Sequence, residues 1–233
     1  AANDGYLLQY IKDKNIPCYG IEPTHGTAQA AREKGIEIVE DFFGVELASR
    51  LQKQGRQADL MIANNVLAHV PDINDFVQGF SILLKPNGIA TFEFPHVLNL
   101  MNNNQFDTIY HEHYSYLSFT AVCNIFNFND LAIFDVEKIT THGGSLRVYA
   151  QLSDSGSYKV NTNVLDLLEK EDRAGMNSIN TYQGFQEQAE GIKNNFLSFL
   201  IKTKNNGHSV VGYGAAAKGS TLLNFSGVRP DLL

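Results

Sequence analysis

Apolar residues in the first part of the chain form short continuous runs. These alternate with stretches in which apolar residues recur every three or four positions. Continuous runs are typical of buried strands, and the periodic stretches are typical of amphipathic helices. We predict strands at 18–23, 36–40, 59–64 and 89–94, a turn at 85–88, and helices at 6–14, from the cap Thr24 to Gly35, at 45–54 and from the cap Asp72 to Leu84. Strands and helices alternating at this spacing predict a mostly parallel, doubly wound α/β sheet.

A polar break at 153–157 separates two parts of the pattern. Before it, Ser118 is placed to cap a helix to about Asn129, and further strands are predicted at 131–139 and 146–152. After it comes a long helical tract with an apolar packing stripe, then a buried strand at 209–214 that enters a small-residue turn before a helix. We therefore predict one domain at 1–152 and a second, partial Rossmann-like domain at 158–233.

Composition narrows the class of protein. The 233 residues are 43% hydrophobic and 18% charged, which is ordinary for a globular protein. The formal net charge is −7, and Lys and Arg are scattered, so nucleic acid and anionic membranes are not expected partners. No apolar run is long enough to span a bilayer, and Cys18 and Cys123 lie inside apolar runs, so we expect a cytoplasmic protein with reduced cysteines. The chain starts in a strand–helix turn and ends as a new α/β unit begins, so we expect it to be part of a longer protein.

The segment 109–118 concentrates groups that move protons near neutral pH. It holds two imidazoles, one carboxylate, three phenols and two hydroxyls, just past an apolar strand, where α/β folds keep their active sites. From the residues alone, a hydrogen-bonded loop histidine is the simpler interpretation of His113. His111 and His113 have the spacing of two metal ligands, but no third ligand is near in sequence, so no metal site is predicted.

A second group of residues favours nucleoside binding. Asn3, Asp4 and Gly5 form a turn that enters a helix, and Glu22 ends the next strand seventeen positions after Gly5. Glycine allows close approach of the backbone to a ligand, and a carboxylate pairs with two ribose hydroxyls. With a single glycine in the turn, a pyrophosphate cradle is poorly supplied. The run Leu-Leu-Lys-Pro-Asn-Gly at 83–88 is frequent in S-adenosylmethionine (SAM) methyltransferases.

These features carry a resemblance to a family. The chain resembles the SAM-dependent sugar C-methyltransferases, which act on nucleotide-linked keto-deoxysugars. The matching runs are 1–9, 20–23, 63–71, 84–88, 110–118, 142–149 and 212–224. The resemblance implies a class I SAM-methyltransferase, Rossmann-like fold, with a zinc-binding domain, a first strand and the end of a C-terminal domain all outside this chain. Ala1 and Ala2 stand where many methyltransferases have glycine.

The resemblance also implies roles for residues. His113 would be the base that removes a proton from carbon, with Tyr110, Glu112, His69 and Asn65 lining the sugar pocket. For SAM, Asn3, Asp4 and Gly5 would face the methionine end, Glu22 the ribose, Asp41 and Phe42 the adenine, and Asn64 the methyl donor. Lys218, opening a helix, would meet the diphosphate with help from Arg147. No metal is needed, since SAM supplies the electrophile, and zinc would belong to the domain outside this chain.

Several alternatives stay open at this point. Phe42 is equally suited to core packing, Arg147 to a cross-strand ion pair, and His142 to a turn. A nicotinamide site at Gly212-x-Gly214 lacks its third glycine. An O- or N-methyltransferase would need only a hydroxyl or amine nucleophile, and a non-catalytic module would bind SAM or the nucleotide sugar without turnover.

Overall fold

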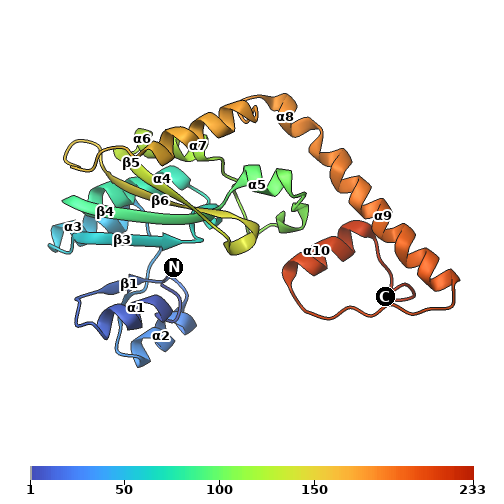
Figure 1. The fold of residues 1–233 in the computed structure, drawn as a ribbon. Helices are drawn as coiled ribbons and strands as arrows, with labels where there is room; N and C mark the ends of the chain where they lie inside the picture. Colours follow the sequence, from blue (N-terminus) through green and yellow to red (C-terminus); the bar gives the residue numbers. More distant parts are fainter. Residues whose placement is uncertain (1) are drawn as a thin grey trace.

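The computed structural model describes residues 2–233 and contains two β-sheets. In the smaller sheet, β1 (Tyr19–Ile21) pairs in parallel with β2 (Glu37–Val39). The larger sheet has the order β3-β4-β6-β5, with bounds Ala58–Asn64, Leu84–Pro95, Ser145–Leu152 and Leu131–Ile139. Figure 1 shows the smaller sheet, with its helices, beside β3 of the larger sheet.

Helices alternate with the strands in the first part of the chain. Their bounds are α1 Tyr6–Lys12, α2 His25–Glu33, α3 Val45–Lys53, α4 Ile73–Leu83, α5 Val97–Asn102, α6 Phe119–Phe128, α7 Thr162–Arg173, α8 Ile179–Gln183, α9 Phe185–Asn205 and α10 Ala217–Ser226, with short 3-10 turns η1 Leu67–His69, η2 Phe106–Thr108 and η3 Thr141–Gly143. The predicted caps are confirmed for two of them: Asp72 accepts hydrogen bonds from the N–H groups of Asn74 and Asp75, and Ser118 accepts one from Ala121. No helix in this described range is both long and apolar enough to cross a membrane.

The larger sheet is mixed, which refines the mostly parallel sheet that the pattern predicted. Strands β3 and β4 are parallel, whereas β6 runs antiparallel to both β4 and β5. The connection between β5 and β6 is the short turn around η3, and a parallel pair would need a crossover of a dozen or more residues. The short connection therefore decides the strand direction.

The predicted turn at 85–88 lies inside β4. Ala58 pairs with Leu84 and Leu60 pairs with Ile89, so residues 85–88 bulge out between two paired positions. The strand therefore begins at Leu84 rather than at Ile89, and a bulge replaces the expected break.

The main core lies between the larger sheet and helices α4, α6 and α7. Phe92 on β4 lies 4.4 Å from Phe80 and 4.8 Å from Phe126, measured between ring centroids. Val164 and Leu167 of α7 belong to the same cluster. The helix that follows the predicted domain boundary at 153–157 thus packs on the first unit, and the division of the chain into domains stays a prediction.

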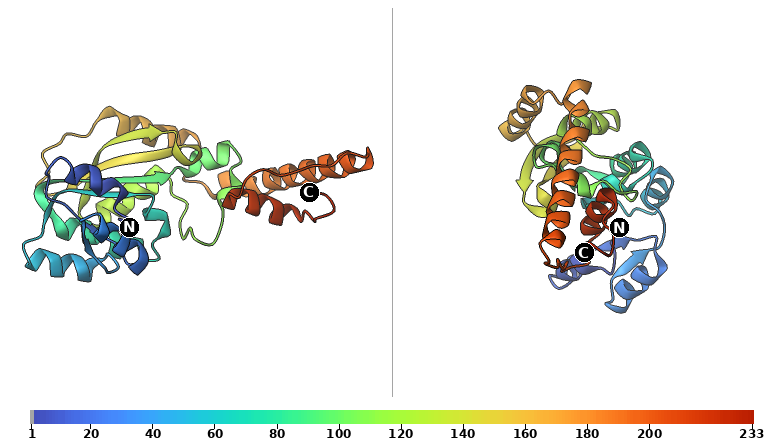
Figure 2. Two further views of the ribbon diagram at one scale, coloured as in Figure 1. Left: turned by 90° about the horizontal axis from the view of Figure 1, so that it is seen from below. Right: turned by 90° about the vertical axis from the view of Figure 1, so that its right-hand side faces the viewer.

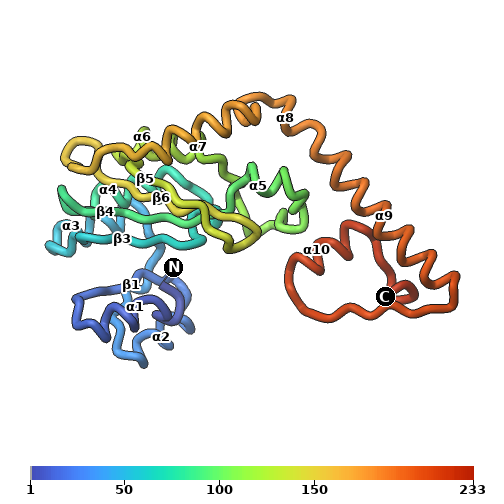
Figure 3. The backbone as a smooth tube through the Cα atoms, viewed as in Figure 1, coloured from blue at the N-terminus to red at the C-terminus, as the bar shows by residue number. Residues whose placement is uncertain are grey.

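Beyond α8 the chain leaves this core. Helix α9 extends away from the sheets and α10 returns beside it (Figures 1 and 2). The ring of Phe225 on α10 lies 5.1 Å from that of Phe106 on η2, which brings α10 back towards the end of the larger sheet. Figure 3 shows the irregular path that joins the two helices.

The strand predicted at 209–214 is wrong, because that path contains no strand and Val211 and Tyr213 are 88% and 107% exposed. A strand needs a hydrogen-bonding partner, and no described strand lies beside this segment.

Candidate functional site

Backbone hydrogen bonds fold the segment 109–118 against the end of the larger sheet. The N–H of Tyr114 donates to the carbonyl of Ala68 at 2.8 Å, which ties the segment to η1. Further along, Leu117 forms a bridge with His96, and the N–H of Val97 donates to the Leu117 carbonyl at 3.0 Å. Two attachments thus fix the polar residues of the segment over the carboxyl ends of β3 and β4.

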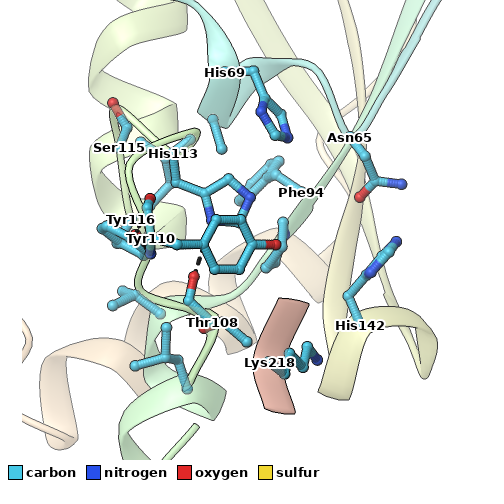
Figure 4. Close-up of a pocket in the computed structure, with 15 residues that line it drawn as sticks. Asn65, His69, Phe94, Thr108, Tyr110, His113, Ser115, Tyr116, His142 and Lys218 are labelled. Atoms are coloured by element: carbon cyan, nitrogen blue, oxygen red, sulfur yellow. Dashed lines mark hydrogen bonds between the residues drawn. The ribbon is translucent and has the colours of Figure 1, made fainter. Parts of the chain in front are cut away.

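A pocket opens between this segment, η1, η3 and the first turn of α10 (Figure 4). Its volume is about 110 Å³. It is lined by Asn65, Ala68, His69, Phe94, Pro95, Val97, Leu100, Thr108, Tyr110, His113, Ser115, Tyr116, Leu117, His142 and Lys218. Segments that are far apart in sequence therefore contribute to one site.

His113 has one ring nitrogen bound and the other without a partner among the described residues. Nδ1 lies 3.2 Å from the carbonyl oxygen of Thr108, and a carbonyl only accepts, so Nδ1 carries the proton. Burial lowers the pKa of His113 below its ordinary value of 6.5, and His69 lowers it further, against the Thr108 hydrogen bond that raises it. The ring is therefore neutral near pH 7, with Nε2 able to accept a proton.

Aromatic rings surround His113. Its centroid lies 4.7 Å from that of His69 and 4.6 Å from that of Tyr110, whose plane is tilted by 31°. Tyr116 lies 5.7 Å away, and its hydroxyl accepts a hydrogen bond from the Tyr110 N–H at 3.2 Å, which closes the loop of the segment. These contacts restrict the orientation of the imidazole.

Asn65 supplies the clearest sign of a ligand. Its φ of 54° is left-handed, and its N–H donates to the Glu93 carbonyl at 2.8 Å. The side-chain Oδ1 is buried and has no hydrogen-bond partner, and it belongs to a residue that lines the pocket. An acceptor in this state calls for a bound group that donates a hydrogen bond.

Several residues of the pocket were not predicted from the sequence. Thr108, Ser115 and Tyr116 line it, although no role was predicted for them, and His142, which was interpreted as a turn residue, lines it too. His142 has a left-handed φ of 53°, an uncommon conformation for a residue other than glycine. The signal that the sequence carried for His142 is its place in the run 142–149, one of those that resemble the C-methyltransferase family.

Of the predicted catalytic and substrate-binding residues, two lie outside the pocket. Glu112 is exposed and is not among the lining residues, although Tyr110 and His113 on either side of it are. Arg147 donates from Nε to the Glu93 carboxylate at 2.6 Å and also pairs with Glu137. Its charge is thus engaged in the cross-strand ion pair that was left open as an alternative.

The predicted cofactor residues lie in the turn before α1 (Asn3, Asp4 and Gly5), after β1 (Glu22), after β2 (Asp41 and Phe42) and at the end of β3 (Asn64). Gly5 has a φ of 75°, and a Cβ there would lie 2.4 Å from Cδ1 of Ile36, so any other residue would be strained and would displace the Ile36 side chain. Glu22 is buried and accepts hydrogen bonds from the N–H groups of Asn3 at 2.9 Å and Thr24 at 3.1 Å. Burial opposes the charge on Glu22, but the Thr24 and Asn3 hydrogen bonds outweigh it and lower its pKa. An ionised carboxylate with two such bonds keeps free acceptor sites for hydroxyl groups.

The side chains of the remaining predicted cofactor residues are open to solvent. Asp41 pairs with Arg50 at 2.6 Å, and Asp4 pairs with Lys34 at 2.6 Å. Phe42 is 80% exposed, which rules out core packing and leaves its face available for stacking. Asn64 ends β3 directly before Asn65 and links this side to the pocket. Over residues 2–233, no three His, Cys, Asp or Glu side chains gather in an arrangement able to hold a metal ion.

Comparisons with known proteins identify the families that the chain matches. Residues 2–136 match a family described as a methyltransferase domain, and residues 140–233 match one described as a C-methyltransferase C-terminal domain. The chain is 32% identical to the C-methyltransferase NovU of Streptomyces niveus over 97% of its own length, and it spans 54% of the length of that relative.

Solved structures show the same fold. A protein from Pyrococcus horikoshii has a TM-score of 0.53 at 15% identity, covering 65% of this chain and 79% of that one. Magnesium protoporphyrin IX methyltransferase from Synechocystis, solved with bound S-adenosylhomocysteine (SAH), has a TM-score of 0.51 at 15% identity, covering 64% and 70%. The fold is thus the Rossmann-like fold of class I methyltransferases, with a mixed sheet. Because the methyltransferase-domain match alone covers more than half of the sequence, the chain belongs to the family of methyltransferase domains.

Proposed function

We propose that this chain carries out SAM-dependent C-methylation of a nucleotide-linked keto-deoxysugar, at the carbon next to the ketone. The observation that carries the proposal is the state of His113, a neutral imidazole whose Nδ1 is held by Thr108 while Nε2 is free beside the pocket. A C–H next to a ketone is removed only where a base and a donor to the developing oxygen act together. The likeness to a named C-methyltransferase supports carbon as the methyl acceptor.

The residues divide the reaction between them. Nε2 of His113 accepts the proton from carbon, and the electron pair of the broken C–H bond moves to the ketone oxygen as an enolate. Tyr110 and His69, which lie beside His113 on the pocket wall, are the donors placed to stabilise that oxygen. The enolate carbon then forms a bond to the methyl group of SAM while the sulfur keeps the electron pair of the broken S–CH₃ bond, which leaves SAH.

The two ligands have separate places. The fit of SAM rests on the buried Glu22 carboxylate, on the exposed Phe42 ring and on the turn at Gly5, whose left-handed backbone packs against Ile36. The nucleotide sugar would place a hydroxyl or amino donor against Oδ1 of Asn65. Lys218, which lines the pocket from the first turn of α10, would meet the diphosphate together with the N–H groups of that helix end.

Solvent exchange tests this function directly. The full-length protein is incubated with dTDP-4-keto-6-deoxyglucose in deuterated water, and deuterium at the carbon next to the ketone is followed by mass spectrometry. We expect exchange in the wild type and in His111→Gln, whose exposed imidazole lies outside the pocket. His113→Gln should lose at least about 100-fold in rate, the smallest effect usual for a general base.

Three results would contradict the proposal. If His113→Gln exchanges deuterium as fast as the wild type, His113 is not the base. Methyl transfer to oxygen or nitrogen without exchange at carbon supports an O- or N-methyltransferase. Binding of SAM and the sugar nucleotide with neither exchange nor transfer supports a non-catalytic module.

A further inference from the structure

A buried carboxylate that has no part in the proposed reaction lies behind the pocket. Glu171 on α7 is 0% exposed. It accepts four hydrogen bonds: Oε1 from Nε2 of His96 and the N–H of Phe119, both at 2.6 Å, and Oε2 from the N–H and the hydroxyl of Thr120, both at 2.7 Å. All four partners are donors, so only a group that accepts at both atoms satisfies them.

The donors come from the two chain segments that frame the pocket. His96 lies between Pro95 and Val97, and both of these line the pocket. Phe119 follows Leu117 by two residues, and Leu117 lines the pocket as well and forms the bridge with His96. One carboxylate therefore joins His96, a partner in the bridge, to Phe119 and Thr120, which follow the other partner, Leu117, by two and three residues.

The charge on Glu171 is held by these bonds rather than by solvent. Burial opposes ionisation, and the hydrogen bonds from His96, Thr120 and Phe119 outweigh it, so its pKa lies below the ordinary value. The N–H groups of Phe119 and Thr120 open α6, where a negative charge also meets the positive end of the helix dipole. A buried charge adds little net stability compared with a well-packed apolar residue, so stability alone gives weak reason for a carboxylate here.

We propose that Glu171 is a positioning residue of the methyl-transfer site: it fixes the carboxyl end of the segment 109–118, so that His113 keeps its hydrogen bond to Thr108 and faces the pocket. The proposal rests on the proposed role of His113 as base. It gives the region matched as a C-methyltransferase C-terminal domain a part in the site of the preceding methyltransferase domain, since Glu171 belongs to the former and His96 and Phe119 to the latter.

The test uses Glu171→Gln in the full-length protein, with Glu169→Gln as the matched control. Glu169 lies on the same helix, is exposed and pairs with Arg173. In Glu171→Gln the amide NH₂ faces at least one backbone N–H, so one donor loses its partner. We expect kcat for methyl transfer to dTDP-4-keto-6-deoxyglucose to fall about 10- to 100-fold with a smaller change in KM, because the base is displaced while the binding groups stay.

A second readout needs no substrate. The ¹⁵N shifts of the His113 ring, assigned with His113→Gln, report which nitrogen carries the proton. The wild type and Glu169→Gln should show protonated Nδ1, and Glu171→Gln should show a mixture of the two tautomers. This measurement distinguishes failure of the positioning role from failure of the proposed function. An active His113→Gln enzyme would show that His113 is not the base. An unchanged ring spectrum in Glu171→Gln would show that Glu171 does not position it.

Thr120 keeps the test decisive if Glu171→Gln does not fold. Thr120→Val removes one of the four donors and should lower kcat about 3- to 10-fold, and Thr120→Ser, which restores the hydroxyl, should recover it. A folded Glu171→Gln with unchanged kcat and unchanged His113 tautomer overturns the proposal. So does an unfolded Glu171→Gln together with a Thr120→Val protein that matches the wild type, or a fall in kcat with no change at His113.

Discussion

The two halves of the site are built in different ways. Around His113, the chain is tied by backbone bonds to Ala68 and Val97, packed against aromatic rings, and braced from behind by Glu171. On the side proposed to bind the nucleoside, Phe42 is exposed and Asp41 is paired at the surface. The contrast indicates that the half proposed to hold the base is preorganised, while the half proposed to hold SAM is open and completes its contacts with the ligand.

Removal of the proposed base should produce the largest effect on kcat. A small effect would contradict the comparison between the two halves. In His113→Gln we expect kcat to fall by about 10²- to 10⁴-fold, because proton removal from carbon loses its acceptor. The affinity for SAH, measured by calorimetry, should stay within about twofold, because His113 belongs to the other half. A parallel loss of SAH affinity would show that the two halves are not separate.

The pH dependence sharpens the same contrast. The base works as the neutral imidazole, and burial with His69 holds the pKa of His113 below 6.5. Activity should therefore persist to lower pH than an exposed histidine allows, and log(kcat/KM) should then fall by about one per pH unit below the folded-state pKa. An acid limb centred above 6.5 would contradict the burial of this ring.

On the open side, Glu22→Gln should weaken SAH binding about tenfold. The amide loses the charge that receives the Asn3 and Thr24 N–H groups and that is proposed to receive the ribose hydroxyls. Glu33→Gln on α2 is the matched control, since Glu33 is exposed. Calorimetry should show unchanged affinity for SAH in the control. Unchanged affinity in Glu22→Gln as well would contradict the proposed contact with the ribose.

Phe42→Ala should give the smallest effect. Loss of stacking on adenine weakens SAH binding about 2- to 12-fold, the equivalent of about 0.5–1.5 kcal/mol. Because the side chain is 80% exposed, the melting temperature should not move. Phe128→Ala, at a residue that is 78% exposed on the end of α6, serves as control for both measurements.

Features that depend on residues close in sequence were predicted correctly, whereas features that depend on distant partners were not. Asp72 and Ser118 were predicted as caps from their positions, and each accepts from residues two or three positions away. The strand at 209–214 was wrong because its apolar pattern is necessary for a strand but does not supply a partner. The direction of β6 was likewise decided by a turn and by pairing with β4.

The candidate site divides in the same manner. The residue types at 110–118 marked the segment, and the resemblance to a family suggested that His113 acts as base. The tautomer of His113, the orphaned Oδ1 of Asn65 and the place of His142 depend on contacts between segments. The sequence gives the type of each side chain, whereas its protonation state and its exclusion from solvent depend on neighbours that folding brings together.

For this protein, residue order alone was enough to establish the alternation of strands and helices, two of the caps and the segment rich in proton-moving groups, because these depend on periodicity and on neighbours within a few positions. Folding added the mixed sheet, the pocket and the anchoring of that segment by Glu171. The physical reason is distance along the chain, because Glu171 and His96 are 75 positions apart. No local sequence pattern predicts that a carboxylate and four donors will meet in the buried interior.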